Sequence, residues 1–216
     1  MATSSGNFPR RASLIDELTR SEHYFIEDTD KCLFIGEYTS GGGPKYSQTN
    51  QLIINLKKPM NRRGLYEWRY KESAISTAAV AIRNVFREEY LGRWTFVPVP
   101  PSKARSHPDY DDRMTQVLRS IRHHPPIDLR ELIVQVESTK AAHETEDRPR
   151  PEQIEAGYIV DEHLTEPRPN GLMVVDDVLT TGAHFKAAQA VLSRRFPKVP
   201  IVGLFIARRA VTIDDE

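Results

Sequence analysis

Two adjacent carboxylates and the threonine-rich loop after them are the residues of this sequence best suited to chemistry. Asp176 and Asp177 directly follow the apolar run 172–175, and the Thr-Thr-Gly sequence at 180–182 precedes a stretch of good helix formers. A continuous apolar run is typical of a strand buried on both faces. We therefore expect the two carboxylates at the end of that strand, outside the core, followed by a tight loop and a helix.

The loop at 180–182 has the features of a phosphate site. The first N–H groups of a helix have no partner within the helix, and they attract anions. A phosphate placed there would take these N–H groups and the two threonine hydroxyls as donors, and each charge-assisted hydrogen bond contributes roughly 1.5–3 kcal/mol. The alternative is an ordinary helix start capped by threonine, although these elements seldom occur in this order.

The acidic pair needs an explanation of its own, because carboxylates repel a neighbouring phosphate unless hydroxyls or a cation lie between them. A ribose ring meets this condition when its 2′- and 3′-hydroxyls donate to the carboxylates and Mg²⁺ offsets the charge. The combination predicts a ribose 5-phosphate site. In it, Asp176 and Asp177 would be the catalytic residues, and each would hold Mg²⁺ through water.

A second anion site is predicted where another strand ends. The apolar run 95–99 leads into a proline-rich exit, which presents Ser102, Lys103 and Arg105 from a stiff loop. Arg113 follows near the start of a helix. Ligands of open parallel sheets bind at the carboxyl ends of the strands, so this loop is expected beside the first site. The alternative is that Lys103 and Arg105 are ordinary surface charges.

The composition restricts the class of protein. The chain has 216 residues, 39% of them apolar, and 30 basic residues balance 30 acidic ones. This balance argues against bulk nucleic-acid binding or an anionic membrane surface as the main role. The single cysteine, Cys32, excludes an intrachain disulfide and a cysteine-based zinc site. Neither a secretory signal nor a membrane-length apolar run is found, so a cytoplasmic protein is expected.

The order of elements predicts an α/β fold with a doubly wound, mostly parallel sheet. Strands are expected at 95–99, 132–136, 172–175 and 201–206, and helices at 47–57, 70–91, 111–122 and 185–194. A helix at 13–20 and a hairpin of 23–26 with 32–38 would form a small N-terminal cap. We predict a flexible N-terminus (1–12) and a single domain (13–216), with a cap (13–69), a core (70–210) and a mobile hood loop (137–155).

The sequence resembles the type I phosphoribosyltransferases, whose signature is a strand followed by two acids and a Thr-Thr-Gly loop, here 174–183. Within them it is most similar to the ComF-like branch over roughly 38–207, through this loop, the Lys57-Lys58 helix and the Pro98-Val99-Pro100 segment. It differs in lacking the N-terminal four-cysteine zinc module. It also has His184 where the phosphate loop commonly has threonine. His184 would either donate to the phosphate when protonated or point away from it.

The resemblance implies a type I phosphoribosyltransferase-like fold and assigns the site residues. The ribose and its 5′-phosphate would contact Asp176, Asp177, Val178, Leu179, Thr180, Thr181, Gly182, Ala183 and His184. Pyrophosphate would contact Ser102, Lys103, Arg105 and Arg113, together with Lys140 and Arg148 of the hood loop. The reaction would be transfer of ribose 5-phosphate from phosphoribosyl pyrophosphate, with Mg²⁺, to a nitrogen acceptor such as a nucleobase.

The acceptor base itself is not specified by the sequence. Tyr38, Tyr46 and Tyr158 are candidates for stacking on a base, and core or surface packing is the alternative for each of them. A homodimer is compatible with these expectations. The alternative function is a regulatory module that senses phosphoribosyl pyrophosphate or a nucleotide without turnover, and only this alternative requires a nucleic-acid or protein partner.

Overall fold

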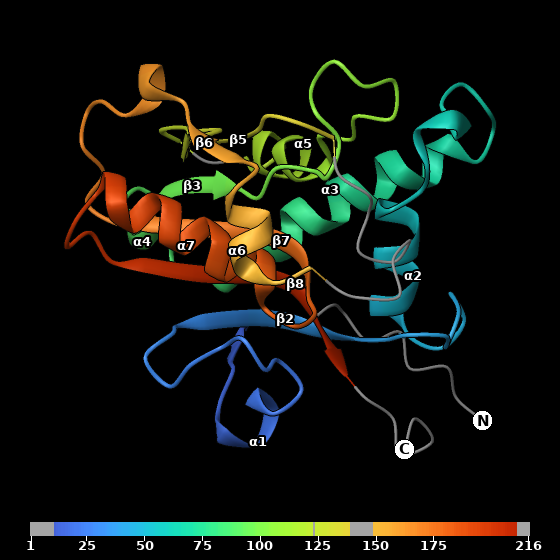
Figure 1. Ribbon diagram of the computed structural model, residues 1–216. Coiled ribbons are helices and arrows are strands. Elements are labelled where there is room, and N and C mark those ends of the chain that lie inside the picture. Colours follow the sequence, from blue (N-terminus) through green and yellow to red (C-terminus); the bar gives the residue numbers. More distant parts are fainter. Residues whose placement is uncertain (1–10, 123, 139–148, 211–216) are drawn as a thin grey trace.

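A six-stranded sheet forms the centre of the computed structural model, which describes residues 11–122, 124–138 and 149–210 (Figure 1). The strands are β1 (Ser13–Leu14), β2 (Cys32–Thr39), β3 (Thr95–Pro98), β4 (Asp128–Leu129), β7 (Leu172–Leu179) and β8 (Ile201–Ala210). Their order across the sheet is β1-β2-β8-β7-β3-β4, and only the β1–β2 pair is antiparallel. The predicted α/β class with a mostly parallel sheet is confirmed.

Apolar side chains alternate between the two faces of the sheet and fill one core on each side. Val175 of β7 and Leu204 of β8 belong to one core, whereas their neighbours Val174 and Phe205 belong to the other. Successive side chains of a strand point to opposite faces, so a continuous apolar run requires cover on both. The run 172–175 behaves as the sequence predicted, because all four residues are buried.

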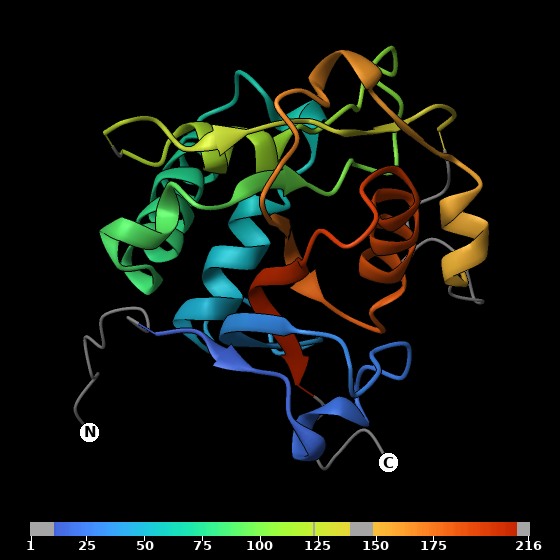
Figure 2. The ribbon, with the colours of Figure 1, turned by 90° about the vertical axis from the view of Figure 1, so that its left-hand side faces the viewer.

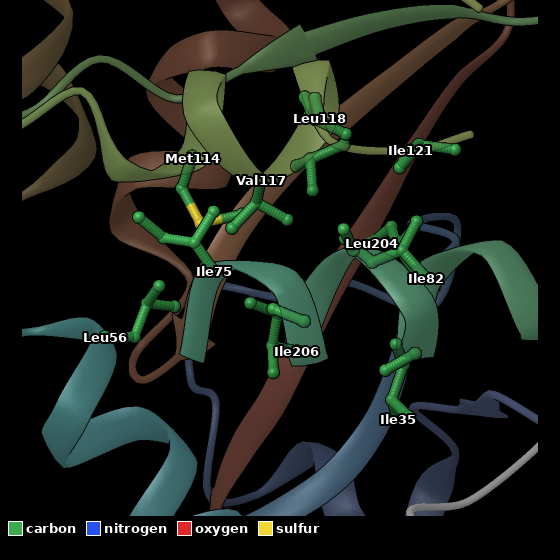
Figure 3. Packing of buried hydrophobic residues seen from close by; sticks show 14 of the residues in the cluster. Ile35, Leu56, Ile75, Ile82, Met114, Val117, Leu118, Ile121, Leu204 and Ile206 are labelled. Atoms are coloured by element: carbon green, nitrogen blue, oxygen red, sulfur yellow. The ribbon is translucent and has the colours of Figure 1, made fainter. Parts of the chain in front are cut away.

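Helices cover the two faces separately (Figure 2). One face carries α2 (Gln48–Leu56), α3 (Trp68–Val85) and α5 (Arg113–Arg119), whose apolar residues pack together in Figure 3. The other face carries α7 (Ala183–Arg195), against which α6 (Pro151–Glu155) packs. No helix in the described ranges is both long and apolar enough to cross a membrane.

The remaining elements are short. Strands β5 (Ile133–Gln135) and β6 (Tyr158–Val160) form a separate antiparallel sheet. The helices α1 (Glu17–Arg20) and α4 (Glu88–Leu91) and the 3-10 turns η1 (Met60–Arg62) and η2 (Glu162–Leu164) complete the described chain.

The strands that follow β3 and β7 are added to the sheet in opposite directions, and this switch determines where the site lies. From β3 the chain crosses through α5 to β4 at one edge, whereas from β7 it crosses through α7 to β8 in the opposite direction. The two crossover helices lie on opposite faces. The strands β3 and β7 pair directly, with Pro98 opposite Val175. Such a reversal leaves a crevice at the carboxyl ends of the two strands, where open α/β sheets bind ligands.

The N-terminal part differs from the prediction. Residues 23–26 form turns and not a strand, so the expected hairpin is wrong, and β2 finds its antiparallel partner in β1. The helix expected from Ser13 begins at Glu17, because the side chain of Asp16 accepts from the backbone N–H groups of Leu18 and Thr19 and caps it. Strand β2 lies inside the sheet between β1 and β8, so residue 70 does not separate a cap from the sheet.

Only the two ends of the predicted hood loop (137–155) lie among the described residues. Residues 139–148, including Lys140 and Arg148, lie outside the described residues, as does most of the N-terminus predicted to be flexible (1–10). Residues 151–155 form α6, so the loop is shorter than expected. Its N-terminal end follows β5, which pairs with β6.

Asp30 ties the segment before β2 to α7, and its removal should destabilise the fold. The carboxylate is buried and accepts from Glu27 N, Lys186 Nζ and Gln189 Nε2. Asp30→Ala leaves these donors without their shared acceptor, so we expect a loss of about 2–3 kcal/mol in the free energy of urea unfolding.

Asp28→Ala is the matched control. The side chain of Asp28 is 85% exposed and pairs with Arg20 at the surface, so its loss should cost less than about 1 kcal/mol. Equal losses in the two variants would contradict the role assigned to Asp30.

Candidate functional site

A cavity of about 470 Å³ opens at the carboxyl ends of β3 and β7. Its walls come from the end of β7, the start of α7, the loop after β3, the start of α5, strand β5 and the connection from α2 to η1. Its size is ordinary for a small-molecule site. The sequence-predicted residues that line it are Ser102, Lys103, Arg105, Arg113, Asp176, Asp177, Val178, Thr180 and His184.

The N-terminal segment fixes the direction of the loop between β7 and α7. The backbone carbonyl of Thr180 contacts Nδ1 of His23, and the carbonyl of Thr181 accepts from Phe25 N at 3.0 Å. In a planar trans peptide the C=O and the following N–H point in opposite directions. The N–H groups of Thr181 and Gly182 therefore point away from the N-terminal segment, as donors to an anion must.

Gly182 allows this tight turn. Its φ is +89°, a left-handed conformation, and a Cβ on it would lie 2.6 Å from Cδ1 of Ile26. Only glycine adopts this conformation without strain, and only glycine fits against Ile26. Glycine at this position thus lets the backbone of the loop, at the start of α7, lie close to Ile26.

The two threonines of the loop have different roles. Thr180 is partly exposed and lines the cavity. Thr181 is buried, and its hydroxyl oxygen accepts from the N–H of Ala183 at 3.4 Å. The N-cap of α7 is Gly182, which has no side-chain cap, so neither threonine is the helix cap considered as the alternative. Leu179 is buried in the core.

The acidic pair does not lie outside the core as expected, because β7 continues through both residues to Leu179. The side chain of Asp177 is only 4% exposed. Its Oδ2 accepts from Arg113 Nε at 2.7 Å and lies 2.6 Å from Arg113 Nη2, and Lys57 Nζ lies 3.0 Å from its Oδ1. A carboxylate has about four acceptor positions, and three of them are taken by these two cations.

Asp176 has a different environment, although it is the next residue. It is partly exposed, lines the cavity, and accepts at Oδ1 from the N–H of Asp177 at 2.8 Å. Within the described chain no cation pairs with it at salt-bridge distance. Asp176 is therefore the carboxylate of the pair with more capacity to accept hydrogen bonds from a ligand.

The electrostatics separate the two carboxylates further. Burial and the negative charge of Asp177 raise the pKa of Asp176 above its ordinary value. Burial also disfavours ionisation of Asp177, but Arg113 and Lys57 outweigh it and hold the pKa of Asp177 below its ordinary value. Two adjacent acids with pKa values pushed apart are common where proton transfer or ligand binding occurs.

The predicted pyrophosphate residues line the cavity but have different partners. Ser102, Lys103 and Arg105 line the cavity, and Arg105 Nη2 lies 2.7 Å from Glu131 Oε2. The loop is braced by Ala104 N, which donates to Ser138 Oγ at 3.0 Å. Arg113 also lines the cavity, but its partner is Asp177. The two arginines that line the cavity are therefore paired with different carboxylates.

His184 lies at the cavity wall and contacts Tyr158. Its Nδ1 is 3.0 Å from the hydroxyl of Tyr158, a residue buried in the core and not presented for stacking on a base. Burial lowers the pKa of His184 to about 4. His184 is therefore neutral near pH 7, which is unlike the protonated phosphate donor considered from the sequence. Of the other tyrosines, Tyr38 packs against the core and Tyr46 is exposed.

Several residues of the site were missed by sequence reasoning. The sequence favours a solvated face for the Lys57-Lys58 pair, with an anion contact as the alternative, and it gives His23, Asp111 and Lys71 no role in the site. One signal was available for Lys71, because it lies on the apolar stripe of its helix, three, four and seven residues before Ala74, Ile75 and Ala78. A lysine in such a stripe indicates a buried cation with a partner.

The donor set at the cavity is compatible with Mg²⁺ that is shared with a ligand. In the described ranges no group of three or more His, Cys, Asp or Glu is arranged to hold a metal ion. Mg²⁺ typically takes one or two carboxylates, substrate phosphates and several waters. Asp176 offers such a carboxylate at the cavity, whereas the oxygens of Asp177 already serve Arg113 and Lys57.

Comparison with known proteins adds no assignment. A scan against protein-family models finds no matching family, and a search of curated proteins finds no matching sequence.

The neutral state of His184 predicts a stability that falls in mild acid. The unfolded chain takes up a proton near the ordinary histidine pKa of 6.5, whereas the folded chain does so only near 4. Folding is thus favoured above pH 6.5, and the contribution is lost as the pH falls toward 4. Between these limits wild type should lose about 1–3 kcal/mol more unfolding free energy than His184→Gln.

Urea unfolding of both proteins at several pH values gives this difference. Subtracting the variant removes the contribution of His23, whose pKa is also lowered by burial. Parallel curves for the two proteins would show that His184 is not held neutral by the fold.

Proposed function

We propose that this protein is a phosphoribosyltransferase, which transfers ribose 5-phosphate from phosphoribosyl pyrophosphate to a nitrogen acceptor, such as a nucleobase, and releases pyrophosphate. The observation that carries the proposal is the loop between β7 and α7. Its carbonyls are held from behind by the segment 23–26, its N–H groups point the other way, and two carboxylates precede it at a cavity. A cytoplasmic location is the expectation that goes with this function.

The sugar phosphate would be bound at the end of β7. The 5′-phosphate would accept from the amides of the loop and from the Thr180 hydroxyl, aided by the dipole of α7. Asp176 would accept from the ribose hydroxyls as the main sugar contact. Asp177 would contribute its remaining acceptor position and orient Lys57 and Arg113.

In the reaction a nitrogen of the acceptor forms a bond to C1′ while the bond from C1′ to the pyrophosphate oxygen breaks. The bonding electrons leave with pyrophosphate, and positive charge develops on the ribose ring. Lys103, Arg105 and the Lys57–Arg113 pair would stabilise the leaving group, so that catalysis is chiefly electrostatic. When Mg²⁺ is bound, it would neutralise the pyrophosphate charge, and Asp176 would hold it through water.

One observation favours the alternative of a sensor that binds phosphoribosyl pyrophosphate or a nucleotide without turnover. Lys57 and Arg113 are both paired with Asp177, so their charges are partly neutralised and less available to stabilise a leaving group. A sensor needs affinity for the ligand but not the charge stabilisation of a transition state.

Substitution of Asp176 tests the sugar contact. Asp176→Asn should weaken the binding of phosphoribosyl pyrophosphate with Mg²⁺ by at least about tenfold, because a charged acceptor for the ribose hydroxyls is lost. Calorimetric titration measures the affinity, and release of pyrophosphate with a panel of bases measures turnover.

Asp109→Asn is the control, because Asp109 also lines the cavity but its side chain is 60% exposed. It should change the affinity less than about threefold. No binding to wild type would refute the proposal, and binding without pyrophosphate release for any base would favour the sensor.

A further inference from the structure

Lys71 is a lysine in the protein interior. It lies in the first turn of α3, and its side chain is 1% exposed. Its Nζ donates to the carbonyl of Leu56 at 2.8 Å, to the carbonyl of Lys58 at 3.0 Å and to Oδ2 of Asp111 at 2.7 Å. An ammonium group has three protons, so each has an acceptor. Lysine is seldom buried unless it is paired in this way.

The three acceptors lie next to Lys57 and Arg113, two of the cations that line the cavity. Leu56 and Lys58 are the residues on either side of Lys57, at the end of α2. Asp111 lies two residues before Arg113, and the same Oδ2 that accepts from Lys71 also accepts from Arg113 Nη1 at 2.9 Å. One buried ammonium group thus joins the backbone around Lys57 to the side chain of Arg113.

Lys57 and Arg113 meet at Asp177 on the cavity wall. Arg113 binds Asp177 through Nε and Nη2, and Lys57 lies 3.0 Å from its other oxygen. The side chain of Lys57 is 43% exposed, so its ammonium group remains accessible from the cavity that both cations line. The pair is placed to contact an oxyanion that enters beside Asp177.

We propose that Lys71 is the positioning residue for an oxyanion subsite, formed by Lys57 and Arg113, that takes phosphate oxygens of the ligand. The inference rests on the proposed function for the identity of the ligand, but the effect of Lys71 on Arg113 does not depend on it. Lys71 does not line the cavity, so it acts through Asp111 and through the backbone around Lys57.

The charge of Asp111 explains why Lys71 would affect the position of Arg113. Asp111 is largely buried, and among the described residues its Oδ1 has no hydrogen-bond partner. Its charge is therefore balanced at Oδ2 by Lys71 and Arg113. Without Lys71, the carboxylate of Asp111 would draw Arg113 toward itself and away from Asp177. A buried charge that loses one partner imposes a large cost on its remaining contacts.

The first experiment needs no ligand. In ¹⁵N-arginine NMR spectra the Nε–H of Arg113, assigned by its absence in Arg113→Lys, should exchange slowly with water because Asp177 accepts from it. Lys71→Met should accelerate this exchange by at least about tenfold, since the paired state is less populated. Exchange within about twofold of wild type would overturn the proposal.

Two further variants keep this test decisive. Arg130→Met removes another largely buried cation, paired with Asp128. It should leave the exchange rate of the Arg113 Nε–H unchanged. Faster exchange in Arg130→Met would show that any loss of stability accelerates the exchange of Arg113. The double variant Lys71→Met/Asp111→Asn removes the competing carboxylate, so slow exchange should return even if Lys71→Met alone does not fold. Fast exchange in the folded double variant would contradict the charge-balance argument.

The second experiment tests the subsite with inorganic pyrophosphate and ribose 5-phosphate. Lys71→Met should weaken pyrophosphate binding by about tenfold or more and ribose 5-phosphate binding by less than about threefold, because the loop at 180–184 holds the latter. Equal losses would reveal a merely structural role and overturn the proposal. If wild type binds pyrophosphate but not ribose 5-phosphate, the subsite stands and the proposed function fails. If it binds neither, both fail, whereas the NMR result still decides whether Lys71 positions Arg113.

Discussion

The ion pair between Asp177 and Arg113 is the interaction on which the organisation of the cavity depends. A carboxylate buried in a core strand is costly unless cations and hydrogen bonds compensate it. Arg113 supplies two of these contacts and Lys57 a third. This requirement brings together the end of α2, the start of α5 and the end of β7, which are the walls of the cavity. The ion pairs of one carboxylate thus join three distant segments that also share an apolar core.

The sheet provides the place where this network can form. Because β3 and β7 are neighbours and their crossover helices cover opposite faces, a crevice is left at their carboxyl ends. Both faces of β7 are packed with apolar side chains at 172–175 and again at Val178 and Leu179, and the two carboxylates lie between these apolar stretches. The rigid strand then holds Asp176 and Asp177 in different environments, although they are adjacent in sequence.

The loop after β7 depends on a segment far away in the sequence. His23 contacts the carbonyl of Thr180 across 157 residues of chain, and Phe25 donates to the carbonyl of Thr181. Ile26 packs where a Cβ on residue 182 would lie. Long-range contacts of this kind orient the peptide groups of the loop, which a short turn does not achieve alone. The orientation of the loop therefore depends on how the segment 23–26 packs against it.

The sequence by itself determined the α/β class, the buried strand at 172–175 and the helix after the Thr-Thr-Gly loop, because these depend on local apolar periodicity and on glycine. It also predicted that Lys103, Arg113 and Asp176 lie in one region, because the carboxyl ends of parallel strands meet at one edge of the sheet. Only the tertiary structure decided that Asp177 is buried and paired, that Tyr158 belongs to the core, and that residues 23–26 support the loop instead of forming a hairpin. Burial and pairing of a charge depend on which segments meet in space, and a local sequence pattern does not predict those long-range contacts.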